Sequence, residues 1–152
     1  MSLTTGDLVD RIADHLAATL PASPDSARWT RSRFLPGQLG QDTEAKKARA
    51  WSVWAPSSQR LQSNERQRPA EGSLVDTTIE VGFSRPLRAD NASADFVAAM
   101  AEEDVLRLAC VSVSRVNLAR FVLTGSSRSV SGDGLTLITI LTWAAAHTIP
   151  LQ

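Results

Sequence analysis

Two histidines are the side chains best suited to acid-base chemistry in this sequence. His15 follows Asp14 in a predicted helix, and His147 stands at the end of the last predicted strand. A Ser-His-Asp triad would also need a nucleophilic serine, but no serine stands in a GxSxG motif. Because a lone histidine at the end of an element is usually a surface or rim residue, we predict no catalytic residue.

The spacings typical of metal and cofactor sites are also missing. The sequence has no HxH, HExxH or CxxC motif, and its one cysteine, Cys110, stands among apolar residues and is expected in the core. Residues 132–134 precede a predicted strand and lack the GxxxxGKS or GxxxxGKT pattern, which favours a hairpin turn over a phosphate-binding loop. We predict no cofactor, no cofactor-binding or metal-binding residue, and no enzymatic activity.

Two groups of acidic residues could be imagined as ligand sets, but each is predicted to be a solvated helix face. The first group lies opposite an apolar stripe that contains Leu8, Ile12 and Leu16. In the second group, Asp104 lies near the apolar stripe and could pair with an arginine. The groups are Asp7, Asp10 and Asp14, and Glu102, Glu103 and Asp104.

Length and composition favour one globular domain over residues 1–152. The chain holds 16 Lys and Arg against 16 Asp and Glu, and this zero net charge argues against a dedicated nucleic-acid binder. One cysteine cannot close an internal disulfide, so a reducing site of synthesis is expected. The N-terminal residues do not resemble a signal peptide, and the apolar stretch at 135–146 is too short to span a bilayer. We expect a soluble protein without membrane contact.

The charges are unevenly spread along the chain. Residues 21–90 hold 11 basic and 8 acidic residues, and the remainder holds 5 and 8. The basic side chains could face a negatively charged partner, or they could simply keep loops solvated. Those considered are Arg28, Arg31, Arg33, Lys46, Lys47, Arg49, Arg60, Arg66 and Arg68.

The elements of the first half are one helix and two strands. Apolar residues at four-residue spacing predict a helix over 3–20, which begins with a capping-box pair, Thr4 and Asp7, and ends at Pro21. Tryptophans and phenylalanine among polar residues predict strands at 28–35 and 49–55, with a loop and one helical turn between them. Residues 56–73 are polar and predict a long mobile loop, since they bury too little surface to order the backbone.

The second half predicts a strand, a helix and a hairpin. Residues 74–85 alternate and should place Val75, Ile79 and Phe83 on a core face. A helix from about 91 to 110 should bury the stripe that contains Val97, Val105 and Leu108. Strands at 119–124 and 135–147 should flank a polar turn, and the second is apolar on both faces, which predicts a central position covered on both sides.

The resulting fold class is α+β, with a mostly antiparallel sheet and two main helices packed on it. The predicted order is α-β-β-(long loop)-β-α-β-β.

Four segments of the C-terminal half carry a resemblance to a known family. They are the strand VDTTIEVGFSRPL, the helix NASADFVAAMAEEDVLRLAC, the polar hairpin TGSSRSVSGDGL and the closing strand LTLITILTWAAAHTIPL. In this order, after an amphipathic helix and a polar loop, they resemble the tail terminator proteins (tail completion, minor-tail-protein-U-like) of long-tailed phages and gene-transfer particles. Residues 28–55 and the loop at 56–72 have no counterpart that can be matched residue by residue.

The resemblance implies a virion structural protein, made in the host bacterial cytoplasm and located in the tail or neck. Such subunits form a ring, typically a homohexamer, on the head-proximal end of the tail tube. The ring ends tube polymerisation and joins the tail to the head connector, without catalysis. Its partners would be further copies of this chain, the tail-tube protein and the head-tail connector, and DNA would pass through the lumen without specific binding.

Three other functions fit the sequence. Another neck protein, such as a head-completion or stopper protein, would look similar. A small cytosolic enzyme or ligand-binding domain would need a site made of scattered residues such as His15, Asp104, Arg120 and His147. A nucleic-acid-binding module would use the basic residues of 28–49.

Overall fold

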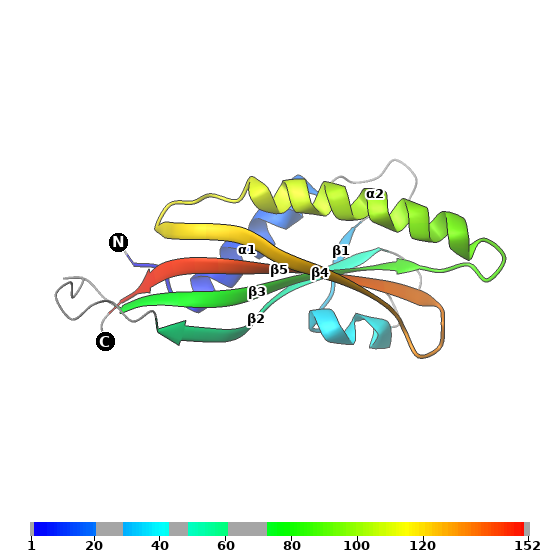
Figure 1. The fold of residues 1–152 in the computed structure, drawn as a ribbon, viewed down its shortest axis with the longest axis horizontal. Helices are drawn as coiled ribbons and strands as arrows, with labels where there is room; N and C mark the ends of the chain where they lie inside the picture. The colour runs from blue at the N-terminus through cyan, green and yellow to red at the C-terminus, as the bar shows by residue number, and fades with distance from the viewer. Residues whose placement is uncertain (1, 21–28, 43–48, 61–72, 151–152) are drawn as a thin grey trace.

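A five-stranded sheet forms the centre of the computed structural model, which describes residues 2–20, 29–42, 49–60 and 73–150 (Figure 1). Its strand order is β1-β2-β3-β5-β4, and all neighbours are antiparallel except the parallel pair β1 and β2. The α+β class and the predicted order of helices and strands are confirmed. The elements are α1 (Thr5–Thr19), β1 (Thr30–Arg31), the 3-10 helix η1 (Pro36–Gln41), β2 (Ala50–Arg60), β3 (Ser73–Pro86), α2 (Ala92–Val111), β4 (Leu118–Val130) and β5 (Thr136–Ile149).

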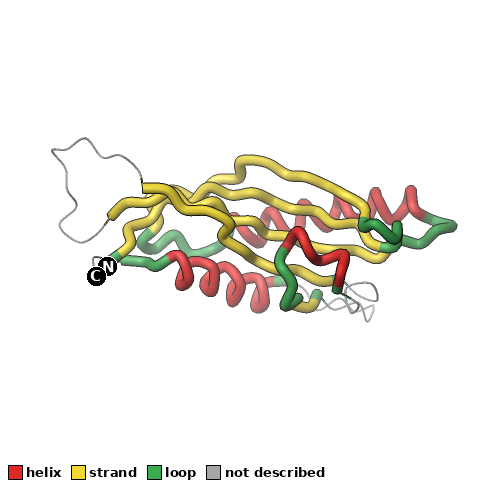
Figure 2. Tube along the Cα trace, turned by 90° about the horizontal axis from the view of Figure 1, so that it is seen from below, coloured by secondary structure: helices red, strands yellow, loops and turns green. Residues whose placement is uncertain are grey.

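The two faces of the sheet are covered by different elements. Val75, Ile79 and Phe83 of β3 are buried on the face that carries α1 and α2, as predicted, and Ile79 and Phe83 pack in the main core. The alternate residues of β3 point to the other face, where a Cβ on Gly82 would lie only 2.6 Å from Cβ of Pro36 in η1. The main helices therefore lie on one face, and η1 lies on part of the other (Figure 2).

Helix α1 forms as predicted, for local reasons. Thr4 Oγ1 accepts a hydrogen bond from the backbone N–H of Asp7, and the Thr4 N–H donates to the Asp7 carboxylate, which completes the capping box. Leu8, Ile12 and Leu16 are fully buried. The acidic residues Asp7, Asp10 and Asp14 are exposed, as expected for a solvated face.

The strands of the first half differ from the prediction. The segment at 28–35 contains only the two-residue strand β1, because the chain then turns into η1, which begins at Pro36. Strand β2 is longer than predicted and continues through Arg60, with a register shift between Trp54 and Ser57. That irregularity accommodates Pro56, which has no backbone N–H to donate.

The predicted mobile loop is therefore wrong for residues 56–60 and for Ser73, which belong to β2 and β3. The polar side chains of this strand end are exposed, while its backbone is ordered by pairing with β3. Sequence polarity gave no sign of this pairing. The rest of the predicted loop, residues 61–72, lies outside the described residues.

The C-terminal hairpin is larger than predicted. Strand β4 continues through Val130, so the turn is confined to residues 131–135, where Gly134 has φ of +74°. Strand β5 lies between β3 and β4, which confirms its interior position. The prediction that both faces of β5 are covered is confirmed only in part. On the face away from α1 and α2, Ile138 and Ile140 pack with η1, whereas Thr142 and Ala144 are only half-buried.

Candidate protein interface on helix α2

Helix α2 is rotated relative to the sequence prediction. Its acidic residues Asp95, Glu102 and Glu103 face the sheet and are buried, whereas Val97 and Leu108, predicted in the core, are 65% and 71% exposed. The predictions of a buried apolar stripe and of solvated Glu102 and Glu103 are wrong. The physical reason lies in the sheet, which presents arginines to this helix. Burying a carboxylate is tolerated when cationic donors face it.

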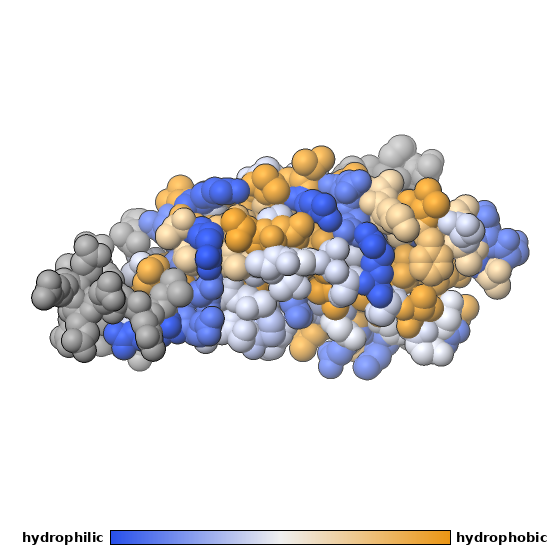
Figure 3. All heavy atoms as spheres, viewed as in Figure 1, coloured by the Kyte–Doolittle hydropathy of each residue, from blue (hydrophilic) through white to orange (hydrophobic). Residues whose placement is uncertain are grey.

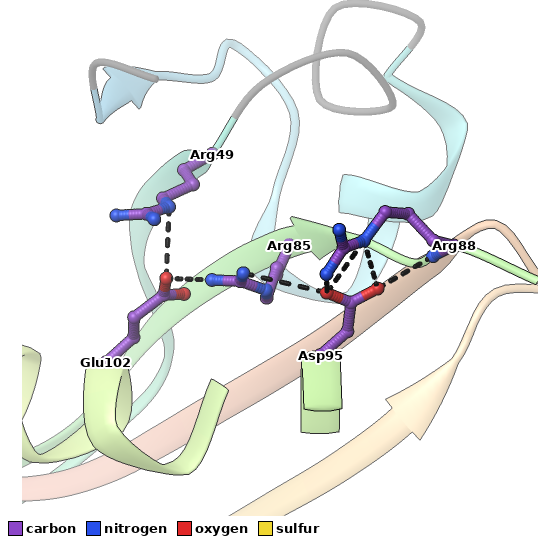
Figure 4. A network of polar contacts seen from close by, with 5 residues as sticks. All are labelled: Arg49, Arg85, Arg88, Asp95 and Glu102. Carbon is purple, nitrogen blue, oxygen red and sulfur yellow. Dashed lines mark hydrogen bonds and ion pairs between the residues drawn. The ribbon is translucent and has the colours of Figure 1, made fainter. Parts of the chain in front are cut away.

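Arg85 of β3 lies between two of the buried carboxylates (Figure 4). On one side it contacts Asp95, with Nη2 3.7 Å from Oδ1, and on the other it bonds Glu102. Arg88 completes the set around Asp95, because its Nη2 lies 2.8 Å from Oδ1 and its backbone N–H donates to Oδ2. The hydrogen bond from the Arg88 side chain lowers the pKa of the Asp95 carboxyl.

Glu102 has a different environment, although it also contacts arginines. Arg49 Nε lies 3.0 Å from Oε1 of Glu102, the same oxygen that Arg85 bonds, and Oε2 is buried without a hydrogen-bond partner among the described residues. Burial raises the pKa of the Glu102 carboxyl, against the opposite effect of the two arginines. Glu102 is thus held in place at an electrostatic cost.

Glu103 is bonded by arginines from two elements. Arg107, one turn further along α2, donates to Oε1 at 2.9 Å, and Arg128 of β4 bonds Oε2. Three buried carboxylates are therefore matched by five arginines, an excess of two positive charges beneath and beside the helix. The sequence holds a signal for part of this arrangement, since Arg85 follows Val75, Ile79 and Phe83 in the alternation of the predicted strand at 74–85 and so belongs to its core face. It holds none for Arg128, which falls in the predicted polar turn.

The outward side of α2 is apolar. Five large apolar side chains there have exposed fractions between 43% and 71%. Figure 3 shows orange surface along the edge that α2 forms, with hydrophilic groups between. A helix that buries its charges and exposes its apolar residues is typical of an interaction surface, since contiguous apolar patches on a monomer usually mark such sites. We call these residues the α2 stripe: Val97, Met100, Val105, Leu108 and Val111.

The scattered residues of an alternative enzyme site lie in separate environments. His147 is fully buried, not at a rim as predicted, and its Nδ1 and Nε2 bond Leu3 O and Thr77 Oγ1. His15 bonds the C-terminal end of α2 through Ala109 O, 3.0 Å away.

The other two members of that site belong to opposite sides of the sheet. Arg120 of β4 pairs with Asp76 of β3 at 2.8 Å, on the face away from the helices. Asp104 is exposed on the outward side of α2. Within the described part of the chain, no hydrogen bond or ion pair joins any two of the four residues.

The described arginines of the predicted basic region have separate environments. Arg49 is engaged with Glu102, while Arg31 and Arg33 stack on Trp51 and Phe34 and line a shallow pocket of about 390 Å³. Arg28, Lys46, Lys47, Arg66 and Arg68 lie outside the described residues.

The described ranges contain possible metal ligands and the one thiol of the chain. No group of three or more His, Cys, Asp or Glu side chains there is arranged to hold a metal ion. Cys110 is buried, as predicted, and burial raises the pKa of its thiol to about 12. None of the helices in the part of the chain that the structure covers is long and apolar enough to cross a membrane.

Comparison with known families and with curated proteins gave no match to this chain. The exposed apolar side of helix α2 is therefore the feature of the structure that bears most directly on function.

Proposed function

We propose that this protein is a virion structural protein of the tail terminator type, which forms a ring on the head-proximal end of a tail tube. The α2 stripe carries the proposal. An isolated chain with this surface would leave large apolar side chains in water, and packing against another protein would remove that cost at roughly 25 cal/mol per Å².

The buried charges of α2 support a role in assembly. Arginines from β3, β4 and the start of β2 fix the helix on the sheet through Asp95, Glu102 and Glu103. A helix held in this way presents a rigid surface, which reduces the entropy lost on association. A subunit that binds neighbouring copies would use such a surface.

The element order supports the specific assignment. An N-terminal capped helix, a β-hairpin, a second helix and a closing hairpin follow one another as in the family that the C-terminal half resembles. In this function the ring ends tube polymerisation and joins the tail to the head connector. Its localisation is then the virion tail or neck, and DNA passes through its lumen without specific contacts.

Native mass spectrometry and negative-stain imaging of the purified protein test the proposal, alone and with the tail-tube protein of its particle. We expect a ring with a central hole and a mass near six subunits. Leu108→Asp should shift the population toward monomer. Leu135→Asp is the matched control, because Leu135 is also half-exposed but lies outside the α2 stripe. A protein that stays monomeric in both settings would contradict the proposed function.

A further inference from the structure

The face of the sheet opposite α2 is a second surface without cover in the described part of the chain. Helix η1 occupies only one end of that face, around Gly82 and Ile138. At the other end, Trp54 and Val122 are 40% and 43% exposed. The view of Figure 3 includes this area, where pale and apolar surface predominates. We define it as the open face: Trp54, Thr78, Glu80, Val122, Thr142 and Ala144.

The α2 stripe and the open face lie on opposite sides of the sheet. Residues of β3 alternate between the two sides, so that Ile79 packs under the helices and Thr78 and Glu80 point away from them. Two different patches on one subunit produce head-to-tail contacts, which close into a ring when the rotation between neighbouring copies closes and otherwise give an open filament. A contact of the stripe with itself would produce only a two-fold dimer.

Charges at the two surfaces are complementary. Asp104 lies between Leu108 and Met100 on the outward side of α2 and is the charged residue of that strip. Arg120 stands beside Val122 at the margin of the open face and is 48% exposed, with donors left over after its pair with Asp76.

The strand edges are less suited to mediate the contact. Strand β4 has two register shifts, after Leu118 and after Leu123, and β2 carries Pro56 and its own shift. Bulges and proline are the devices by which sheets prevent pairing with another strand. The apolar surfaces, not the edges, are therefore the regions available for association.

From these observations we infer that the α2 stripe of one copy packs on the open face of the next copy, with Asp104 against Arg120. This head-to-tail mode rests on the proposed function, because it specifies how the ring subunits meet. Helix α2 of one copy would then cover the open face of the next copy. This single contact would bury both the α2 stripe and the open face.

Disulfide cross-linking between copies tests the mode. A Leu108→Cys chain and a Val122→Cys chain of different mass are mixed, oxidised, alkylated and resolved without reductant. We expect the mixed cross-link in excess over either homodimer, and a covalent ladder from the double variant. The native Cys110 is buried and adds little background. Leu108→Cys mixed with Leu135→Cys is the control and should remain unlinked.

The outcomes separate the two proposals. Cross-linking of Leu108→Cys only with itself, or an intact ring without the mixed cross-link, would overturn the head-to-tail mode and leave the proposed function standing. A chain that is monomeric with and without tail-tube protein would remove both. Far-UV circular dichroism confirms that the variants fold, which is expected because all substituted positions are exposed.

A double-mutant cycle tests the ion pair independently. Asp104→Ala and Arg120→Ala should each raise the dissociation constant between subunits about fivefold, and the double variant should raise it no further. Independent effects, about 25-fold in the double variant, would show that the two residues do not meet.

Discussion

Arg49 Nε lies 3.0 Å from Oε1 of Glu102, the carboxylate oxygen that Arg85 also bonds, so one oxygen joins the start of β2 to the middle of α2 and to the end of β3. The contact lies on the side of α2 that faces the sheet, where Ala99, Leu106 and Ala109 are also buried. With its acidic residues turned toward the sheet, the helix leaves the α2 stripe exposed. The exposed stripe and the ion-pair network are thus two consequences of one rotation.

Glu102→Ala should lower the free energy of unfolding by about 2–3 kcal/mol, because it leaves two arginines facing a buried site without their carboxylate. This cost is smaller than that of breaking a fully buried pair, since both arginines retain access to water. Urea unfolding measured at a protein concentration that keeps the subunit monomeric gives the value. Asp10→Ala, at an exposed position of α1, should change it by less than about 0.5 kcal/mol. Equal effects of the two substitutions would disprove the structural role of Glu102.

Acid should weaken the fold through Asp95. The pKa of Asp95 is lowered in the folded state by the hydrogen bond from Arg88, so its stabilising effect is complete above the ordinary value of 3.8 and is lost as the pH falls through the folded pKa. Asp95→Asn should therefore be less stable than the parent protein at pH 7, and the difference should shrink as the pH falls below the ordinary value of 3.8. Thermal unfolding across this range checks the effect, with Asp10→Asn as control. A constant difference at all pH values would contradict it.

The parts of the fold that the sequence predicts well are those with local causes. The capping box of α1 and the alternation of β3 each depend on neighbouring residues, and both are observed. The orientation of α2 depends instead on what the sheet presents to it. Val97 and Leu108 recur at helical spacing, but so do Asp95, Glu102 and Glu103, and hydrophobicity alone selects the wrong set.

Two further differences have non-local causes. The end of β2 is polar, so composition predicts a loop, yet Ser57 and Gln59 are paired with β3. His147 is buried because the residues before α1 cover the end of β5, where Leu3 N–H donates to Thr148 O. Pairings between distant segments leave little trace in a single sequence. The candidate interface is likewise not evident from the sequence, because the residues of the α2 stripe have the spacing of a core stripe.

Gly82→Ala should destabilise the protein by about 1–3 kcal/mol. The added Cβ would lie 2.6 Å from Cβ and 2.9 Å from Cα of Pro36, so that the backbone of η1 would have to move. Gly125→Ala is the matched control, because a Cβ on that strand glycine meets nothing within 4 Å and should be neutral or slightly stabilising. Chemical denaturation of both variants decides the matter. Unchanged stability in Gly82→Ala would mean that η1 does not pack on β3 as described.

His147→Ala should release the N-terminal segment as well as lower stability. His147 is fully buried, with Nδ1 2.7 Å from Leu3 O and Nε2 2.8 Å from Thr77 Oγ1, and Ser58 Oγ lies 2.8 Å from the same threonine. Loss of these bonds and the cavity left behind should cost about 3 kcal/mol. Hydrogen exchange at the Leu3 amide, which donates to Thr148 O, should accelerate far more than exchange within α2.

The matched control for that substitution is His15→Ala, which also removes an imidazole that bonds a backbone carbonyl. His15 is only partly buried, between α1 and the end of α2, so its loss leaves a site that water can enter. We expect a cost of about 1 kcal/mol and no change in exchange at Leu3. If both variants lose the same stability and Leu3 stays protected in each, His147 does not hold the N-terminal segment against β5.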